Sequence, residues 1–189
     1  MIGEDFPAVL IAAQQGDEVA FATLWHDGQP ALLRYLRVLA PDMAEDIAAE
    51  TWTYVVRGLA RFRGNEQNWR AWLFTTARRR VIDQTRQLMR RPATSLEALP
   101  DPALADLPGV RGPDAADLAL ENLATRAAIG AIANLPPMQA EVIMLRVVAG
   151  LDTETVAQLL GRSPGAIRVA AHRGLHRLAG LLAEAGVTR

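Results

Sequence analysis

Apolar residues recur at helical spacing along almost the whole chain, and they leave no alternating run of the kind that a half-buried strand needs. This helical spacing of apolar residues predicts an all-α protein. Two helical stretches are expected between Phe21 and Leu39, broken near the HDGQP segment (26–30) and stopped at Pro41. A third helix is expected to follow and to end near Gly58.

A proline-rich segment interrupts the helical pattern. Residues 92–117 contain five prolines and no sustained apolar period, which is typical of an extended linker. The chain is therefore expected to form two small helical domains, residues 1–91 and 118–189. In the second domain, Pro136-Pro137 should begin the second helix and Gly150 should end it.

Composition argues against several functional classes. The absence of cysteine excludes disulfides and thiolate metal sites and is typical of a cytoplasmic protein. No metal-ligand spacing or cofactor motif is present, and His26 beside Asp27 has no nucleophile nearby, so an enzyme is not expected. The N-terminus lacks the basic region of a signal peptide, and no apolar run approaches the ~20 residues of a membrane span.

Charge is distributed unevenly along the chain although its net value is only −1. Residues 69–91 carry seven arginines against one acid, and residues 161–183 carry four arginines, two histidines and no acid. Residues 92–117 between them carry five acids against one arginine. Two basic segments separated by an acidic one indicate a polyanionic partner contacted at two places.

The segment LDTETVAQLLGRSPGAIRVAAHRGLHRL, residues 151–178, has the pattern of a helix-turn-helix. Asp152 should cap the first helix and Gly161 should end it with a positive φ. Ser163 should cap the second helix, with Pro164 at its first position. Small Ala157 is expected where the two helices cross.

One side of that second helix is apolar and should be buried: Ile167, Ala170, Ala171, Leu175 and Leu178. The other side and the turn should be exposed, and a helix presented in this way suits the major groove of duplex DNA. The candidate contacts are Arg162, Ser163, Pro164, Gly165, Arg168, Val169, His172, Arg173 and Arg177. The alternative interpretation is an ordinary helical hairpin with a solvated basic face.

A second candidate site combines arginines with aromatic residues. On a helix from Asn68, Leu73, Ala77 and Val81 share one buried face, which leaves the basic residues elsewhere. Stacking surfaces beside phosphate-binding groups are what unpaired bases require. The candidates are Arg61, Phe62, Arg63, Asn65, Gln67, Asn68, Trp69, Arg70, Arg78, Arg79 and Arg80. Trp72 is better explained as core, whereas core packing and base stacking both remain open for Trp69.

The third helix carries an acidic face formed by Asp42, Glu45, Asp46 and Glu50. Asp42 and Glu45 have the spacing of a capping box and suit the positive end of the helix dipole. Glu50 lies too far into the helix for that explanation. A protein partner with a basic surface is the alternative.

These motifs together resemble the bacterial extracytoplasmic-function (ECF) sigma factors of the sigma-70 family. The stretches GDEVAFATLW and LLRYLRVLA are similar to the start of the family's region 2, and AEDIAAETWTYVVRGLARFRG to its polymerase-binding helix and following loop. NWRAWLFTTARRRVIDQTRQ resembles the helix beside the strand-opening loop. LPPMQAEVIMLRVVAGLDTETVAQLLGRSPGAIRVAAHRGLHRL resembles region 4, so the likeness runs from Gly16 to about Leu182.

The resemblance implies a factor that binds core RNA polymerase and directs promoter-specific initiation. Asp42, Asp46 and Glu50 would face the clamp helices of the β′ subunit, and region 4 would meet the β flap. The loop from Arg61 and the helix after it would hold the melted −10 element, and residues 163–177 would read the −35 duplex. An anti-sigma factor is implied as a further partner, with a monomer as the free state and no cofactor.

Three departures from the family pattern bear on these roles. Ala49 stands where a polar residue, often glutamine, usually precedes the position of Glu50. Arg79 stands where asparagine is common, and Val169-Ala170 where serine and arginine are frequent. Fewer polar base readers are left in the recognition helix, so Arg168 and Arg173 should matter more.

Two other classes of function compete with this interpretation. A one-component helix-turn-helix regulator would form a symmetric dimer on palindromic duplex sites. A helical protein-interaction adaptor would leave the helix-turn-helix unexplained. The arginine-aromatic helix and the acidic face favour the sigma factor over both.

Overall fold

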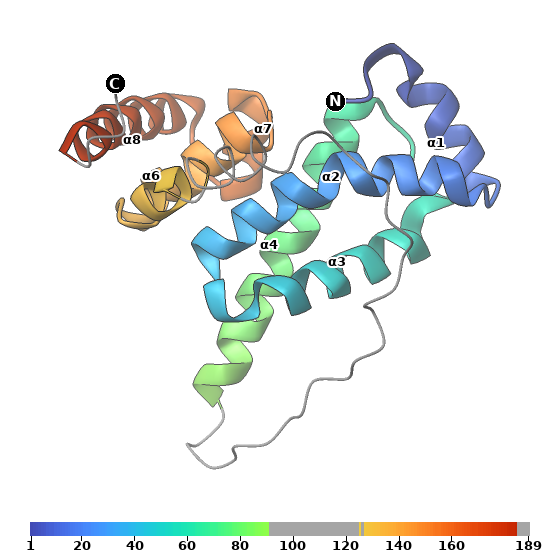
Figure 1. Ribbon diagram of the computed structural model, residues 1–189, viewed down its shortest axis with the longest axis horizontal. Coiled ribbons are helices and arrows are strands. Elements are labelled where there is room, and N and C mark those ends of the chain that lie inside the picture. Colours follow the sequence, from blue (N-terminus) through green and yellow to red (C-terminus); the bar gives the residue numbers. More distant parts are fainter. Residues whose placement is uncertain (91–124, 126, 185–189) are drawn as a thin grey trace, which may run out of the picture.

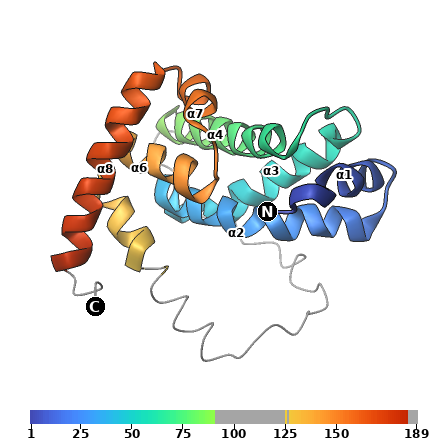
Figure 2. The same cartoon turned by 90° about the horizontal axis from the view of Figure 1, so that it is seen from above.

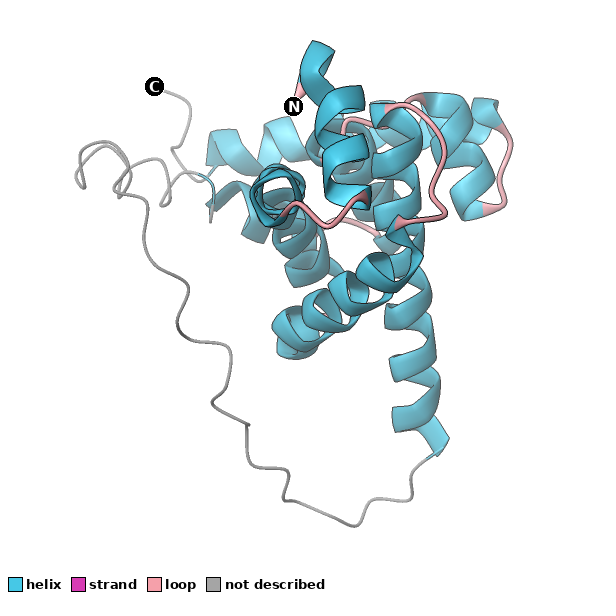
Figure 3. Cartoon of the chain, turned by 90° about the vertical axis from the view of Figure 1, so that its right-hand side faces the viewer, coloured by secondary structure: helices cyan, strands magenta, loops and turns pink. Residues whose placement is uncertain are grey.

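The computed structural model describes residues 1–90, 125 and 127–184 of the chain, and all their regular elements are helical (Figures 1 and 3). The all-α prediction is therefore confirmed. The predicted linker 92–117 lies outside the described residues. None of the described helices is long and apolar enough to cross a lipid bilayer.

The N-terminal half contains four α-helices and two short 3₁₀ turns. In chain order these are the turn Gly3–Asp5, α1 Phe6–Gln14, α2 Glu18–Leu39, the turn Pro41–Met43, α3 Ala44–Leu59 and α4 Glu66–Arg90. Helices α2, α3 and α4 pack against one another, and α1 packs on α2. The side chains between them form a core that includes Leu24, Leu32, Tyr35, Ile47 and Val55.

Helix α2 is continuous through Pro30, so the predicted break at residues 26–30 is wrong. Asp17 caps the helix by accepting a hydrogen bond from the Ala20 N–H at 2.8 Å. Gly28 lies at a close helix crossing, where a Cβ atom would come within 3.0 Å of Leu73 and 3.2 Å of Trp52. Packing at this crossing compensates for the helix hydrogen bond that proline cannot donate.

The start of α3 also differs from the prediction. Asp42 lies in the 3₁₀ turn before α3. The N-cap residue of α3 is Met43, whose side chain makes no capping hydrogen bond. Glu45 instead accepts from the Arg37 guanidinium at 3.0 Å. The capping box assigned to Asp42 and Glu45 is therefore wrong, because the helix begins one residue later than the box requires.

In the C-terminal half, residues 127–133 are helical and are followed by α6 Pro137–Ile143, a π-helical turn Met144–Val148, α7 Thr153–Leu160 and α8 Pro164–Glu184. Asp152 caps α7 by accepting from the Thr155 N–H at 2.7 Å, and Gly161 ends it with a φ of 63°. Both features were predicted from the sequence. The predicted start at Pro136-Pro137 is confirmed, and Gly150 follows the π turn with a φ of 68°.

Helix α8 packs closely against α6 at Gly174, and this contact changes which apolar residues of α8 are buried. Ile167 is buried as expected, whereas Leu175 is 48 % exposed and its predicted burial is wrong. Gly174 is the residue that meets α6, and a Cβ there would lie 2.7 Å from Ile143 Cδ1. The contact with α6 therefore turns Leu175 toward solvent.

The two halves pack directly against each other (Figure 2). Helix α2 contacts α6 and the π turn, and α4 contacts α7. One continuous apolar core contains residues of both halves, from Phe6 to Ile167.

Candidate nucleic-acid interface

The turn and outer face of α8 form the first candidate site. Ser163 Oγ accepts from the Ala166 N–H at 3.2 Å, which fixes the first turn of the helix, and Pro164 occupies its first position. All nine predicted contacts of this helix-turn-helix are exposed: Arg162, Ser163, Pro164, Gly165, Arg168, Val169, His172, Arg173 and Arg177. The structure thus presents one helix face that a major groove can accept.

Two arginines of this face already have partners within the C-terminal half. Arg168 pairs with Glu154 of α7 at 3.1 Å, and Arg177 donates to Gln139 Oε1 at 3.3 Å. Both members of the Arg168–Glu154 pair are about two-thirds exposed. Such a surface pair contributes little to stability, so the guanidinium can exchange a carboxylate for a phosphate or a base edge at low cost.

The loop before α4 forms the start of the second candidate site. Asn65 Oδ1 accepts from the Asn68 N–H at 2.9 Å, and Asn68 Oδ1 accepts from the Asn65 N–H at 3.1 Å, so each caps the other. Arg63 donates to the carbonyls of Ala60 and Phe62. The predicted loop residues Arg61, Arg63, Asn65, Gln67 and Asn68 are all exposed.

The structure decides between core packing and base stacking for the aromatic residues of this site. Trp69 is only 1 % exposed and lies among Phe6, Trp52, Phe62 and Trp72, with ring centroids 5.5–6.5 Å away. The indole therefore belongs to the core, and its inclusion among the candidate DNA contacts is corrected. Trp72 is half-buried and stacks on Phe62 at 5.2 Å, so the half-buried Phe62 ring also has one face covered.

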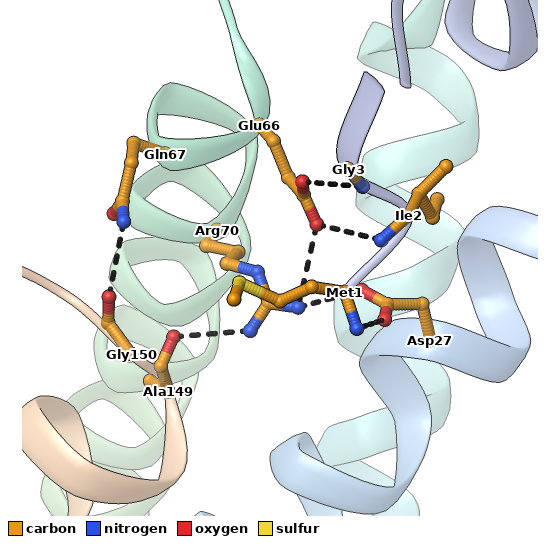
Figure 4. A network of polar contacts seen from close by, with 9 residues as sticks. All are labelled: Met1, Ile2, Gly3, Asp27, Glu66, Gln67, Arg70, Ala149 and Gly150. Atoms are coloured by element: carbon orange, nitrogen blue, oxygen red, sulfur yellow. Dashed lines mark hydrogen bonds and ion pairs between the residues drawn. The ribbon is translucent and has the colours of Figure 1, made fainter. Parts of the chain in front are cut away.

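Arg70 lies in a polar network rather than on a free surface (Figure 4). Its side chain is 11 % exposed, pairs with Asp27 at 2.8 Å and Glu66 at 3.5 Å, and donates to the Ala149 carbonyl at 3.3 Å. Glu66 also accepts from two backbone N–H groups of the first turn of the chain. The prediction that Arg70 contacts DNA is therefore wrong for the folded chain, because Asp27 and Glu66 already neutralise its charge.

The arginine triplet of α4 points in three directions, since successive helix residues lie about 100° apart. Arg78 pairs with Glu141 of α6 at 2.7 Å. Arg79 is exposed, and Arg80 lies over the ring of Tyr54 of α3, with 5.5 Å between its guanidinium carbon and the ring centroid. The three side chains therefore do not form one basic patch.

The acidic face formed by α3 and the turn before it is exposed at Asp42, Asp46 and Glu50. Glu50 accepts from Gln84 of α4 at 3.1 Å and lines a groove between the two helices together with Tyr54, Arg57 and Arg80. An exposed carboxylate row beside a groove can bind a basic helix of a protein partner. Among the residues that the structure describes, no three His, Asp or Glu side chains are grouped to hold a metal ion.

Comparison with known proteins matches each half of the chain to one family model. Residues 24–91 match the family model of sigma-70 region 2, and residues 125–178 match that of sigma-70 region 4. The ECF RNA polymerase sigma factor ShbA of Streptomyces griseus is 35 % identical, over 92 % of this chain and 93 % of that protein. SigD of Mycobacterium tuberculosis is 32 % identical over 98 % and 88 %. The chain belongs to the ECF sigma factors.

Solved structures share the fold of this sigma factor. The sigma factor RpoE of Bartonella quintana, in complex with the anti-sigma factor NepR, aligns with a TM-score of 0.59 at 25 % identity over 89 % of this chain and 98 % of that one. CnrH in complex with the cytosolic domain of CnrY aligns with a TM-score of 0.59 at 22 % identity, over 96 % and 99 %. The region 2 match covers most of α2 and all of α3 and α4, and the region 4 match covers α6, α7 and most of α8.

Three residues of this sigma factor that sequence analysis did not single out have prominent contacts: Asp27, Tyr35 and Glu141. Asp27 was considered only beside His26, yet it pairs with Arg70. Tyr35 is fully buried and donates to Glu141 at 3.1 Å, and burial together with the Glu141 charge raises its pKa well above the usual value of 10.0. No local pattern marks Tyr35 or Glu141, because their partners lie far away in the sequence.

Proposed function

We propose that this ECF sigma factor binds core RNA polymerase and directs it to promoters by reading a −35 duplex and a melted −10 strand. The −35 reader is the exposed face of α8 from Ser163 to Arg177. The −10 site is the loop from Arg61 to Asn68 with the exposed Arg79, and Arg78 joins it when released from Glu141. Trp69 supports this site from the core.

The observation that carries the proposal is the exposure of the whole predicted α8 face in a chain that also matches region 2. Its residues include the donors that contact guanine and phosphate in a major groove, above all Arg168 and Arg173. Val169 and Ala170 add apolar contacts but no donors. Sequence discrimination therefore depends on few side chains.

The acidic face of α3 is the proposed polymerase surface. Asp46 and Glu50 are exposed on it, as contacts with the β′ clamp helices require, whereas Ala49 offers no polar contact there. Region 4 would meet the β flap. Because the relative RpoE is known in complex with an anti-sigma factor, we propose a regulator of that class for this chain as well.

The chain would act in the cytoplasm as a monomer when free of polymerase. Its proposed division is region 2 at residues 1–91, a linker at 92–117 and region 4 at 118–189. No step of promoter recognition by these residues requires a cofactor.

The test is run-off transcription with sigma-free bacterial core polymerase and fragments of the source genome. Discrete transcripts that depend on the protein are expected. Glu50→Arg should abolish them by placing a positive charge against a basic partner surface. Glu4→Arg, which makes the same charge change at another exposed position, is the control and should leave them unchanged.

A chain that supports no transcripts and binds palindromic duplex alone as a dimer would contradict the sigma factor role. That result would favour a one-component regulator.

A further inference from the structure

Three residues of region 2 are bound by the C-terminal half, and two of them, Gln67 and Arg78, belong to the proposed −10 site. Gln67 Nε2 donates to the Gly150 carbonyl at 3.2 Å, and Arg70 Nη1 donates to the Ala149 carbonyl at 3.3 Å (Figure 4). Arg78 pairs with Glu141 at 2.7 Å. In each contact a donor of region 2 meets an oxygen of region 4.

The backbone after α6 is shaped to make these contacts. The π turn Met144–Val148 replaces the last α-helical turn, and the Ala149 N–H bonds back to the Met144 carbonyl at 2.9 Å. Gly150 then takes a positive φ. The carbonyls of Ala149 and Gly150 are left without helical donors of their own and meet α4 instead.

Glu141 forms the charged centre of this interface. Its Oε1 atom accepts from both Arg78 and Tyr35, and the three residues are called the Glu141 cluster below. The Glu141 side chain is 15 % exposed and that of Arg78 is 29 % exposed. A pair so shielded from water is stronger than a surface pair, and removing one partner leaves a poorly solvated charge.

We propose that in the free chain region 4 masks Arg78 of the −10 site, with the Glu141 carboxylate in the place that a promoter phosphate would take on Arg78. This inference rests on the proposed function of region 2. The predicted contacts on the α8 face and the loop from Arg61 to Asn68 are largely exposed, so the masking is confined to the Glu141 contact. The free chain withholds Arg78 from a single strand, and full single-strand binding requires the two regions to separate.

The experiment compares Glu141→Arg with Glu45→Arg. Both reverse one carboxylate that pairs with an arginine, but the Glu45–Arg37 pair lies entirely within region 2. The control therefore reproduces any unspecific gain in DNA affinity from added positive charge. The double variant Glu141→Arg/Arg78→Glu restores an ion pair with its signs exchanged.

Two quantities are measured on the free full-length protein. The radius of gyration from small-angle X-ray scattering should rise in Glu141→Arg, and it should return toward the wild-type value in the double variant. The dissociation constant for a fluorescein-labelled, random-sequence 20-nucleotide single strand should fall about fivefold more in Glu141→Arg than in Glu45→Arg, because a larger fraction of the chain is competent to bind.

An unchanged radius of gyration would overturn the role of the Glu141 cluster in closing the chain. A larger radius with equal affinity gains in the two variants would overturn the masking of Arg78. Neither result would affect run-off transcription by the wild-type protein, so failure of this inference is distinguishable from failure of the proposed function.

Discussion

At the scale of single residues, the burial of Trp69 decides between two roles that the same indole could perform. It is 1 % exposed and contacts four other aromatic rings around the start of α4. A ring in that position supports the loop before α4 from the core and is not accessible to a base. Arg79, ten residues later, is exposed and free of such constraints.

Trp69→Ala is therefore expected to lower the free energy of unfolding by about 3–5 kcal/mol, because it leaves a large cavity in the aromatic core. Arg79→Ala should change it by no more than about 0.5 kcal/mol. Urea denaturation followed by circular dichroism measures both. A Trp69→Ala variant as stable as the wild type would show that the indole is not a core residue.

Arg168 provides a prediction at the DNA surface. Arg168→Ala should weaken recognition of one or two −35 base pairs by about 1–3 kcal/mol each, the value of a bidentate arginine–guanine contact. Run-off transcription over a set of single base substitutions measures the effect. Glu154→Gln, which frees Arg168 from its ion pair, should keep the selectivity; an unchanged base profile in Arg168→Ala would contradict the assignment.

At the scale of the elements, short-range side-chain chemistry fixes the helix-turn-helix. Asp152 caps α7, Gly161 ends it and Ser163 starts α8. The close contact of α8 with α6 depends instead on Gly174, which no cap or turn signal marks. The caps and the crossing can be tested separately.

Asp152→Ala should lower the free energy of unfolding by about 1 kcal/mol at neutral pH through loss of the helix cap. The hydrogen bond from the Thr155 N–H holds the pKa of Asp152 below its usual value of 3.8. The folded state thus favours the carboxylate, so the cap's contribution is complete above that value and is lost as the pH falls through the lowered pKa.

Asp152→Asn keeps an acceptor that does not titrate. Its stability should be close to that of the wild type at neutral pH, and the wild type should lose stability relative to it in acid. Urea unfolding at several pH values measures this difference, and parallel pH profiles would contradict the assignment.

Gly174→Ala should destabilise the protein by about 1 kcal/mol net, because the new methyl group lies 2.7 Å from Ile143 Cδ1 and 3.2 Å from Gln139 Cβ. Gly180→Ala on the same helix meets nothing within 4 Å and should stabilise it by about 0.5–1 kcal/mol through helix propensity. Thermal unfolding measures both shifts. Equal shifts in the two variants would show that α8 does not approach α6 at Gly174.

At the scale of the whole molecule, the two halves share one core and a polar interface. The surfaces used for this packing are therefore occupied within one chain, and the sigma factor needs no second copy to cover them. A regulator that reads palindromic DNA would instead require a symmetric dimer.

We expect the free protein to sediment as a monomer of 20.5 kDa and to bind duplex DNA only weakly without polymerase. Sedimentation equilibrium over a range of protein concentrations measures the mass. A stable dimer would contradict the assignment and favour the one-component regulator.

The sequence by itself determined the helical class, the helix-turn-helix and the exposed face of α8. These features depend on residues three or four apart and on the φ of single positions such as Gly161, so a local pattern is enough to predict them. The same holds for Leu73, Ala77 and Val81, whose shared buried face on α4 is confirmed.

Only the tertiary structure decided the continuity of α2 through Pro30, the exposure of Leu175, the burial of Trp69 and the compensation of Arg70 and Arg78. Each depends on a neighbour from a distant part of the chain: Trp52 and Leu73 against Gly28, Phe6 beside Trp69, and Glu141 opposite Arg78, 63 positions away. A run of arginines shows that charge is present. Which of those charges remain free for DNA depends on the carboxylates that folding brings beside them.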